Sequence, residues 1–222
     1  MIGILAGMGP KSTGPFIDQV VGSFQRITGA RDDIDFPPMM IYSLPTPFYL
    51  DRPIDHALME KTICEGLQKL EACGASFIAM PCNTAHLYFG ALQRSIRIPL
   101  LNIVEETLAR IPKKGKQIAL LATRPTVASE IYQTGLKNAG FVCRMEPAWQ
   151  QSLDLVLKSI KETAKPDTQS WNRLLQSLND AKVDAAILAC TDLNVLLKDS
   201  PLPFIDSAAC LAEAVVRRWQ EF

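Results

Sequence analysis

The chain has 222 residues, enough for one large domain or two small ones at roughly 100–200 residues per domain. Hydrophobic residues make up 48% and charged residues 21%, which is typical of a globular protein and excludes disordered and low-complexity classes. The 23 Lys and Arg residues balance 23 Asp and Glu residues without a basic block, which argues against a nucleic-acid-binding protein. The expected partner is a small molecule or a second copy of the chain.

The amino-terminal sequence MIGILAGMGPK has no positively charged region, and glycines interrupt its apolar stretch. It is therefore predicted to be neither a signal peptide nor an anchor. No stretch approaches the roughly 18 apolar residues of a membrane span. None of the six cysteines forms a CxxC pair, and there are two histidines, so we expect reduced thiols, no zinc site and a cytoplasmic location.

Short apolar runs alternate with longer segments of helical period, a pattern typical of an α/β protein with parallel sheets. In the first half the pattern predicts strands at 1–6, 37–44, 76–80 and 99–103, and helices at 13–28, 54–73, 83–95 and 104–111. In the second half it predicts strands at 116–122, 141–145 and 184–189, and a helix at 126–139.

The second half repeats landmarks of the first in the same order. The strand before Cys82 matches the strand before Cys190, and IPLLNIVEETLA from Ile98 matches LPFIDSAACLAE from Leu202, which aligns Asn102 with Asp206. We interpret this as an internal duplication. The predicted fold is two pseudo-symmetric α/β halves, 1–111 and 112–206, joined near 112–116. The terminal helix at 207–222 is expected to pack back on the first half.

The sequence MPCNTAH places Cys82 at the end of a buried strand, followed by good helix N-cap residues. A helix start favours the thiolate form of a cysteine, and its backbone N–H groups can hold a carboxylate. ACTDLN repeats the arrangement around Cys190. Either site alone is equally compatible with a buried cysteine beside an ordinary helix cap, but the symmetric pair favours a function.

Two thiols across a carboxylate site suit racemisation, in which one base removes the α-proton and a second acid protonates the opposite face. Two related halves are expected to face a shared cleft at the carboxyl ends of their strands. A redox pair is usually local in sequence, which this pair is not. A metal site would need further ligands, and only His86 is near either cysteine in sequence.

The first turn, Gly7-Met8-Gly9-Pro10-Lys11-Ser12, has some features of a phosphate-binding loop. Pro10 breaks the Walker pattern, however, and Ser12 stands where a dinucleotide fingerprint has its third glycine. Nucleotide binding is therefore not favoured.

Taken together, MIGILAGMGPKST, MPCNTAH, LDRP, LLAT and ACTDL resemble the aspartate/glutamate racemase family that works without pyridoxal phosphate. The resemblance covers nearly the whole chain. It is closer to the aspartate racemase branch, because glutamate racemases typically open with Asp-Ser-Gly and carry a histidine after the second Cys-Thr. This chain has Gly7-Met8-Gly9-Pro10 and Cys190-Thr191-Asp192 there.

The resemblance implies that Cys82 and Cys190 are the acid/base residues, with no cofactor and no metal, and that the enzyme is a homodimer acting on an acidic amino acid. The substrate-binding residues that it implies are Asn83, Thr84 and Thr191 for the α-carboxylate, Arg52 and Lys161 for the side-chain carboxylate, and Met8, Thr13, Thr123 and Thr126 in the two equivalent turns.

Two features depart from the family pattern. Asp192 stands where glutamate is frequent, and Thr123-Arg124-Pro125-Thr126 replaces a more usual glycine turn. Two other functions stay open: a carboxylate isomerase of the maleate or hydantoin type, and a binding module without turnover.

The remaining candidates have ordinary structural explanations. His56 and His86 are expected on a helix surface or as satisfied polar groups, with a supporting role open for His86 beside Cys82. Packing roles are expected for Cys64, Cys73, Cys143 and Cys210, and core or interface roles for Trp171 and Trp219.

Overall fold

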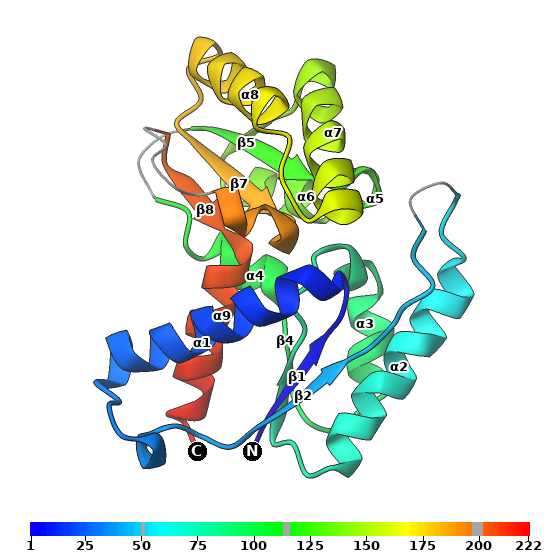
Figure 1. The fold of residues 1–222 in the computed structure, drawn as a ribbon, viewed down its shortest axis with the longest axis vertical. Coiled ribbons are helices and arrows are strands. Elements are labelled where there is room, and N and C mark those ends of the chain that lie inside the picture. Colours follow the sequence, from blue (N-terminus) through cyan, green and yellow to red (C-terminus); the bar gives the residue numbers. More distant parts are fainter. Residues whose placement is uncertain (50–51, 113–115, 197–201) are drawn as a thin grey trace. The chain divides into compact units, whose positions relative to one another are not determined.

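The computed structural model describes residues 1–49, 52–112, 116–196 and 202–222. The chain divides into two compact units: unit 1 comprises Met1–Ile103 and Ala208–Phe222, and unit 2 comprises Val104–Ser207. Each unit contains one four-stranded parallel sheet with helices packed against it (Figure 1). Among the described helices, none combines the length and apolar character needed to cross a membrane.

The sheet of unit 1 has the strand order β2-β1-β3-β4, with every neighbouring pair parallel. Its strands are β1 (Ile2–Ala6), β2 (Met39–Ser43), β3 (Phe77–Ala79) and β4 (Leu100–Leu101). Its helices are α1 (Thr13–Thr28), α2 (His56–Ala72), α3 (Phe89–Arg94) and α9 (Ser207–Trp219), with short 3-10 helices η1 (Pro10–Ser12), η2 (Asp33–Asp35) and η3 (Thr84–Tyr88).

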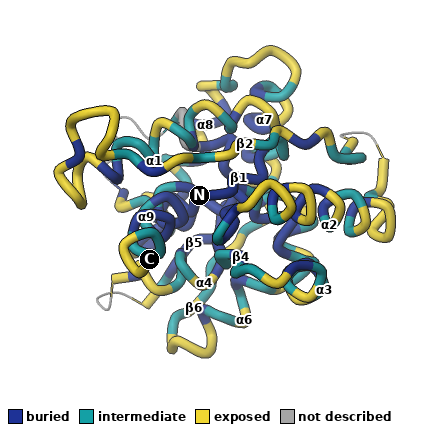
Figure 2. Tube along the Cα trace, turned by 90° about the horizontal axis from the view of Figure 1, so that it is seen from below, coloured by how far each residue is buried: buried dark blue, intermediate teal, exposed yellow. Residues whose placement is uncertain are grey.

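Helices cover both faces of this sheet. Successive side chains of a strand point to opposite sides, so each strand contributes apolar residues to the packing on both faces. Leu5 and Ile78 pack with apolar residues of α2 and α3. Phe77 points the other way, and its ring stacks on Phe222, which follows α9, at 5.8 Å between centroids. The central strand β1 is buried along its whole length (Figure 2).

The sheet of unit 2 has the strand order β6-β5-β7-β8, again parallel throughout. Its strands are β5 (Gln117–Ala122), β6 (Val142–Arg144), β7 (Ala185–Ala189) and β8 (Phe204–Asp206). Its helices are α4 (Ile103–Leu108), α5 (Arg124–Ala128), α6 (Ile131–Asn138), α7 (Pro147–Thr163) and α8 (Thr168–Asp180), with the 3-10 helix η4 (Thr191–Leu196).

Both sheets connect their strands in the same order, so β1, β2, β3 and β4 correspond to β5, β6, β7 and β8. In unit 2, α7 and α8 lie side by side (Figure 1) and form one core with β5 and β7. The predicted fold class, two α/β halves with parallel sheets, is confirmed.

Several helices differ from the sequence prediction. The segment expected as one helix at 83–95 is η3 followed by the short α3. The helix expected at 126–139 is interrupted at Glu130, which has a positive φ of 58°, so that α5 and α6 are separate. The sequence reading also left α7 and α8 unassigned.

The boundary between the units follows Ile103, earlier than the expected boundary at 111. The reason is that α4 packs in unit 2: the hydroxyl of Tyr132 donates to Thr107 Oγ1 at 3.4 Å. Leu108 lies against Gly135, where a methyl group would collide with it. Residues 113–115 of the expected junction lie outside the described residues.

Candidate active site

Cys82 lies directly after the third strand of unit 1. Its backbone N–H donates to the carbonyl of Met80 at 2.8 Å, which folds the chain into a tight turn between β3 and η3. Asn83 is buried and Thr84 is half-buried at the start of η3. The site therefore carries a thiol, an amide and a hydroxyl on three consecutive residues at the carboxyl edge of the sheet.

His86 supports this turn from inside the unit. It is 4% exposed, and its Nδ1 is 2.8 Å from the carbonyl oxygen of Cys82, so Nδ1 carries the proton and donates. The backbone N–H of Ile103 lies 3.2 Å from Nε2, and the carbonyl oxygen of Leu101 lies 3.3 Å from the same nitrogen. Burial lowers the pKa of His86, in agreement with a neutral ring. His86 thus joins the Cys82 turn to the segment after β4.

Cys190 occupies the corresponding place in unit 2, directly after β7. It is buried, and its carbonyl accepts a hydrogen bond from the N–H of Leu193 at 3.1 Å as η4 begins. Thr191 is also buried. The carbonyl of Leu188, two residues before Cys190, accepts from the hydroxyl of Ser207 at 2.8 Å, which ties the end of β7 to the start of α9.

The helices that follow both cysteines are shorter than expected. Each cysteine is followed by a 3-10 helix. The one after Cys82 is five residues long, and the one after Cys190 is six residues long. Short 3-10 segments align few peptide dipoles, so a helix dipole favours a thiolate less here than a long α-helix would.

The glycine turn after β1 has a tightly determined backbone. Gly7 has φ of +95°, and a Cβ there would lie 2.6 Å from the backbone of Leu44. The N–H of Gly7 donates to Thr13 Oγ1 at 3.3 Å, so this predicted binding hydroxyl also closes the turn. Met8 is half-buried, and the Met8–Gly9 peptide bond is cis.

The equivalent turn of unit 2 follows β5. Thr123 is the N-cap of α5, and its Oγ1 lies 2.9 Å from Oγ1 of the buried Thr126. The exposed Arg124 beside them is ion-paired with Asp154 at 2.7 Å. The two threonine hydroxyls therefore form a pair at the carboxyl end of the strand.

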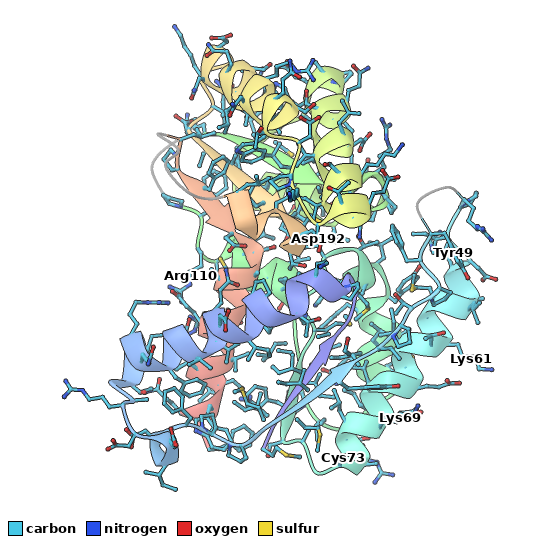
Figure 3. All side chains as sticks on the ribbon, viewed as in Figure 1. Tyr49, Lys61, Lys69, Cys73, Arg110 and Asp192 are labelled. Atoms are coloured by element: carbon cyan, nitrogen blue, oxygen red, sulfur yellow. The ribbon has the colours of Figure 1, made fainter. Side chains whose placement is uncertain are left out.

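Lys161 is connected to the Cys190 segment through an acidic residue. Its Nζ lies 3.1 Å from Oδ2 of Asp192, whose side chain is 4% exposed. Figure 3 labels Asp192 on η4, below α7, which carries Lys161. The cation that was predicted to contact the substrate is thus already paired with a carboxylate of the protein.

Arg52 is exposed, and its guanidinium lies over the ring of Tyr49, which Figure 3 labels, at 4.3 Å from the centroid. A guanidinium binds carboxylates through its planar array of N–H donors. The first two residues of the LDRP motif, Leu50 and Asp51, lie outside the described residues.

The sequence reading did not identify Tyr88 as a neighbour of Cys82. Tyr88 packs against the same apolar cluster as Cys82, and its hydroxyl lies 2.7 Å from Nδ1 of the exposed His56. The pKa of Tyr88 is raised, first by burial and then by the negative charges of Glu60, Asp55 and the Cys82 thiolate. A tyrosine on the 3-10 segment after a strand-end cysteine is the signal that could have indicated it.

The other cysteines differ in exposure. All six are free thiols. The packing role expected for Cys73 is wrong, because Cys73 is exposed at the end of α2 (Figure 3). Burial raises the pKa of the half-buried Cys143 to about 11.

Among the described residues, no group of three His, Cys, Asp or Glu side chains is arranged to hold a metal ion.

The chain is similar to known proteins over nearly its whole length. The family model described as Asp/Glu/Hydantoin racemase matches residues 5–215. The broad specificity amino-acid racemase RacX of Bacillus subtilis is 50% identical over 220 residues, covering 97% of this chain and 96% of that protein.

Solved structures share the fold. The aspartate racemase of Picrophilus torridus is 27% identical with a TM-score of 0.81, covering 98% of this chain and 93% of that one. An aspartate racemase homologue from Pyrococcus horikoshii is 22% identical with a TM-score of 0.78, covering 99% and 98%.

The chain therefore belongs to the Asp/Glu/hydantoin racemase family. Within enzymes it is an isomerase, and its activity is that of an amino-acid racemase.

Proposed function

We propose that Cys82 and Cys190 are the two acid/base residues of a racemase that interconverts L- and D-aspartate, and secondarily glutamate, without pyridoxal phosphate. The observation that carries this proposal is their equivalence. Each cysteine follows the third strand of its unit, and the two sheets have the same strand order. A pseudo-symmetric pair of thiols is what a reaction with two mirror-related directions requires.

In the proposed reaction, the thiolate of one cysteine takes the α-proton. The C–H bond breaks, an S–H bond forms, and the electron pair delocalises into the α-carboxylate as an enediolate. The thiol of the other cysteine then gives its proton to the opposite face of the α-carbon, which leaves a thiolate. Return from the D-isomer uses the same residues with their roles exchanged.

The enediolate carries additional negative charge, so hydrogen-bond donors must be fixed around it before the reaction. We assign this role to Asn83 and Thr84 beside Cys82 and to Thr191 beside Cys190. Burial of Asn83 and Thr191 supports the assignment, because buried polar side chains are held in place by their surroundings. We also assign substrate contacts to Met8, Thr13, Thr123 and Thr126 in the two equivalent turns.

A guanidinium suits the second carboxylate of an acidic substrate, and Arg52 is the proposed partner. Its exposure and its stacking on Tyr49 support this role, since the group is held without burial of its charge. The name of one similar protein, an aspartate racemase, supports an acidic substrate, and that of another, a broad-specificity amino-acid racemase, supports an amino acid without specifying its side chain. We propose that the active form is a homodimer, as the family resemblance implies.

The test is a proton NMR assay with L-aspartate in D₂O and reduced enzyme, without added cofactor, following loss of the α-proton and formation of the D-isomer. Cys82→Ser and Cys190→Ser should each reduce racemisation by about 10²–10⁴-fold, the range for loss of a general acid or base. Cys73→Ser, an exposed cysteine outside the proposed site, is the matched control and should retain full activity.

Exchange that survives in both site variants would reject the two-thiol mechanism. Absence of exchange with aspartate and glutamate in the reduced wild-type enzyme would reject the acidic substrate. Maleate and other dicarboxylates would then be assayed.

A further inference from the structure

The ion pair between Lys161 and Asp192 changes the net charge that unit 2 presents to the side chain of the substrate. Nζ of Lys161 and Oδ2 of Asp192 are 3.1 Å apart, and the carboxylate is 4% exposed while the lysine side chain is 23% exposed. An ion pair removed from water is screened little by salt. The positive charge of Lys161 is therefore compensated within the protein, and its attraction for a second carboxylate is reduced.

The other oxygen of Asp192 supplies an independent observation. Oδ1 is buried, and among the residues that the structure describes it has no hydrogen-bond partner. A buried carboxylate oxygen without a donor is unfavourable by more than an ordinary hydrogen bond contributes. A ligand N–H or O–H that displaces the atoms covering this oxygen would satisfy it, whereas a ligand carboxylate would be repelled.

We infer that Asp192 is a specificity-determining residue that widens the substrate range toward amino acids whose uncharged side chains donate hydrogen bonds, such as amides and alcohols. The inference rests on the proposed function, in which Lys161 contacts the side chain of the substrate. Arg52 retains turnover of acidic substrates, and the Lys161–Asp192 pair removes the requirement for a second carboxylate.

Aspartate and asparagine are suitable probes, because they have the same size and differ in charge and in the amide donor. The measured quantity is kcat/KM for racemisation of L-aspartate divided by that for L-asparagine. In the wild-type enzyme this ratio should lie within about tenfold of one. Asp192→Asn removes the compensating charge and should raise the ratio about tenfold or more in favour of aspartate.

Further variants separate charge from structure. Lys161→Met combined with Asp192→Asn restores a neutral pair and should return the ratio to within about threefold of the wild-type value, as a double-mutant cycle requires for coupled residues. Asp192→Glu preserves the charge and should behave as wild type. Glu162→Gln removes an exposed acid next to Lys161 on α7 and should leave the ratio unchanged.

Equal loss of activity on both substrates in Asp192→Asn would reject the inference and indicate a structural role. A wild-type enzyme that discriminates against asparagine by about a thousandfold would also reject it, and this outcome remains measurable if Asp192→Asn fails to fold. Absence of α-proton exchange with either substrate in the wild-type enzyme would instead reject the proposed function.

Discussion

His86 illustrates how one buried side chain determines the backbone around Cys82. Its Nδ1 donates to the carbonyl of Cys82, and its Nε2 lies near both the N–H of Ile103 and the carbonyl of Leu101. Protonation of Nε2 would favour the contact with Leu101 and oppose the donor of Ile103, and the burial of the charge is the larger effect. The turn that carries the proposed catalytic thiol therefore depends on a ring that must stay uncharged.

We predict that the stability of the protein falls with acidity partly through His86. Because burial lowers its pKa below the ordinary 6.5, the unfolded chain binds the proton first as the pH falls through that value. Its contribution is complete above pH 6.5 and is lost as the pH falls toward the folded-state pKa. Urea midpoints at pH 7.5 and 5.0 should differ more in the wild type than in His86→Leu.

The same variant should be less stable at neutral pH, because it removes the hydrogen bonds of His86 to Cys82 and Ile103, each worth about 0.5–1.5 kcal/mol. His56→Leu is the control, because His56 is exposed and its loss leaves no buried group unsatisfied. An unchanged pH dependence in His86→Leu would show that other groups cause the acid sensitivity.

The sequence predicted the parts of the candidate site that depend on residues adjacent to one another along the chain. Strand-end cysteines followed by capping residues are visible as a pattern, so the positions of Cys82 and Cys190 after their strands followed from it. The pair of Lys161 with Asp192 was not predictable in this way, because α8 and β7 separate the two residues along the chain.

At the scale of secondary-structure elements, the turn between β1 and η1 is the most constrained connection of unit 1. It must pass beside Leu44, whose N–H donates to the carbonyl of Ala6 at 2.9 Å. The positive φ of Gly7 and the lack of a side chain both make this possible.

Gly7→Ala should destabilise the protein by about 2–5 kcal/mol, the sum of left-handed strain and overlap with the backbone of Leu44. Gly74→Ala is a matched control, since Gly74 has a similar φ of +87° but open space around the added methyl group. It should cost about 1–2 kcal/mol. Equal losses in urea titrations would mean that the contact with Leu44 relaxes and that backbone strain accounts for the whole effect.

The apolar runs of the sequence predicted where the strands and helices lie. They did not predict which helical segments are 3-10 helices or where a helix is interrupted. The segment at 83–95 has the composition of a helix, and the buried hydrogen bonds of His86 are tertiary interactions that a periodic pattern does not contain. The break at Glu130 has neither glycine nor proline to mark it, and a non-glycine residue with φ of 58° is a conformation selected by the fold. The central strands β1, β5 and β7 were predicted because burial on both faces produces continuous apolar runs.

At the scale of the whole molecule, the division into units separates two cores that can be perturbed independently. Leu211 of α9 belongs to unit 1 and Leu174 of α8 to unit 2, and both are fully buried. Each Leu→Ala substitution should cost about 2–5 kcal/mol, through lost apolar contacts and the cavity that remains.

Hydrogen exchange should assign each loss to its unit. In Leu211→Ala, amides of β1 and β3 should exchange faster while those of β5 and β7 change less, and Leu174→Ala should show the reverse. Uniform acceleration across both sheets in either variant would show that the two units unfold as a single cooperative structure.

Unit 1 is discontinuous in sequence, since residues 104–207 are inserted before its last helix. During synthesis its four strands leave the ribosome first, yet α9 emerges only after all of unit 2, a delay on the order of ten seconds at 5–20 residues per second. Within that interval all of unit 2 except its last strand, β8, can leave the ribosome. Until α9 and the residues after it emerge, Phe77 lacks its stacking partner Phe222, so this part of the sheet in nascent unit 1 stays exposed.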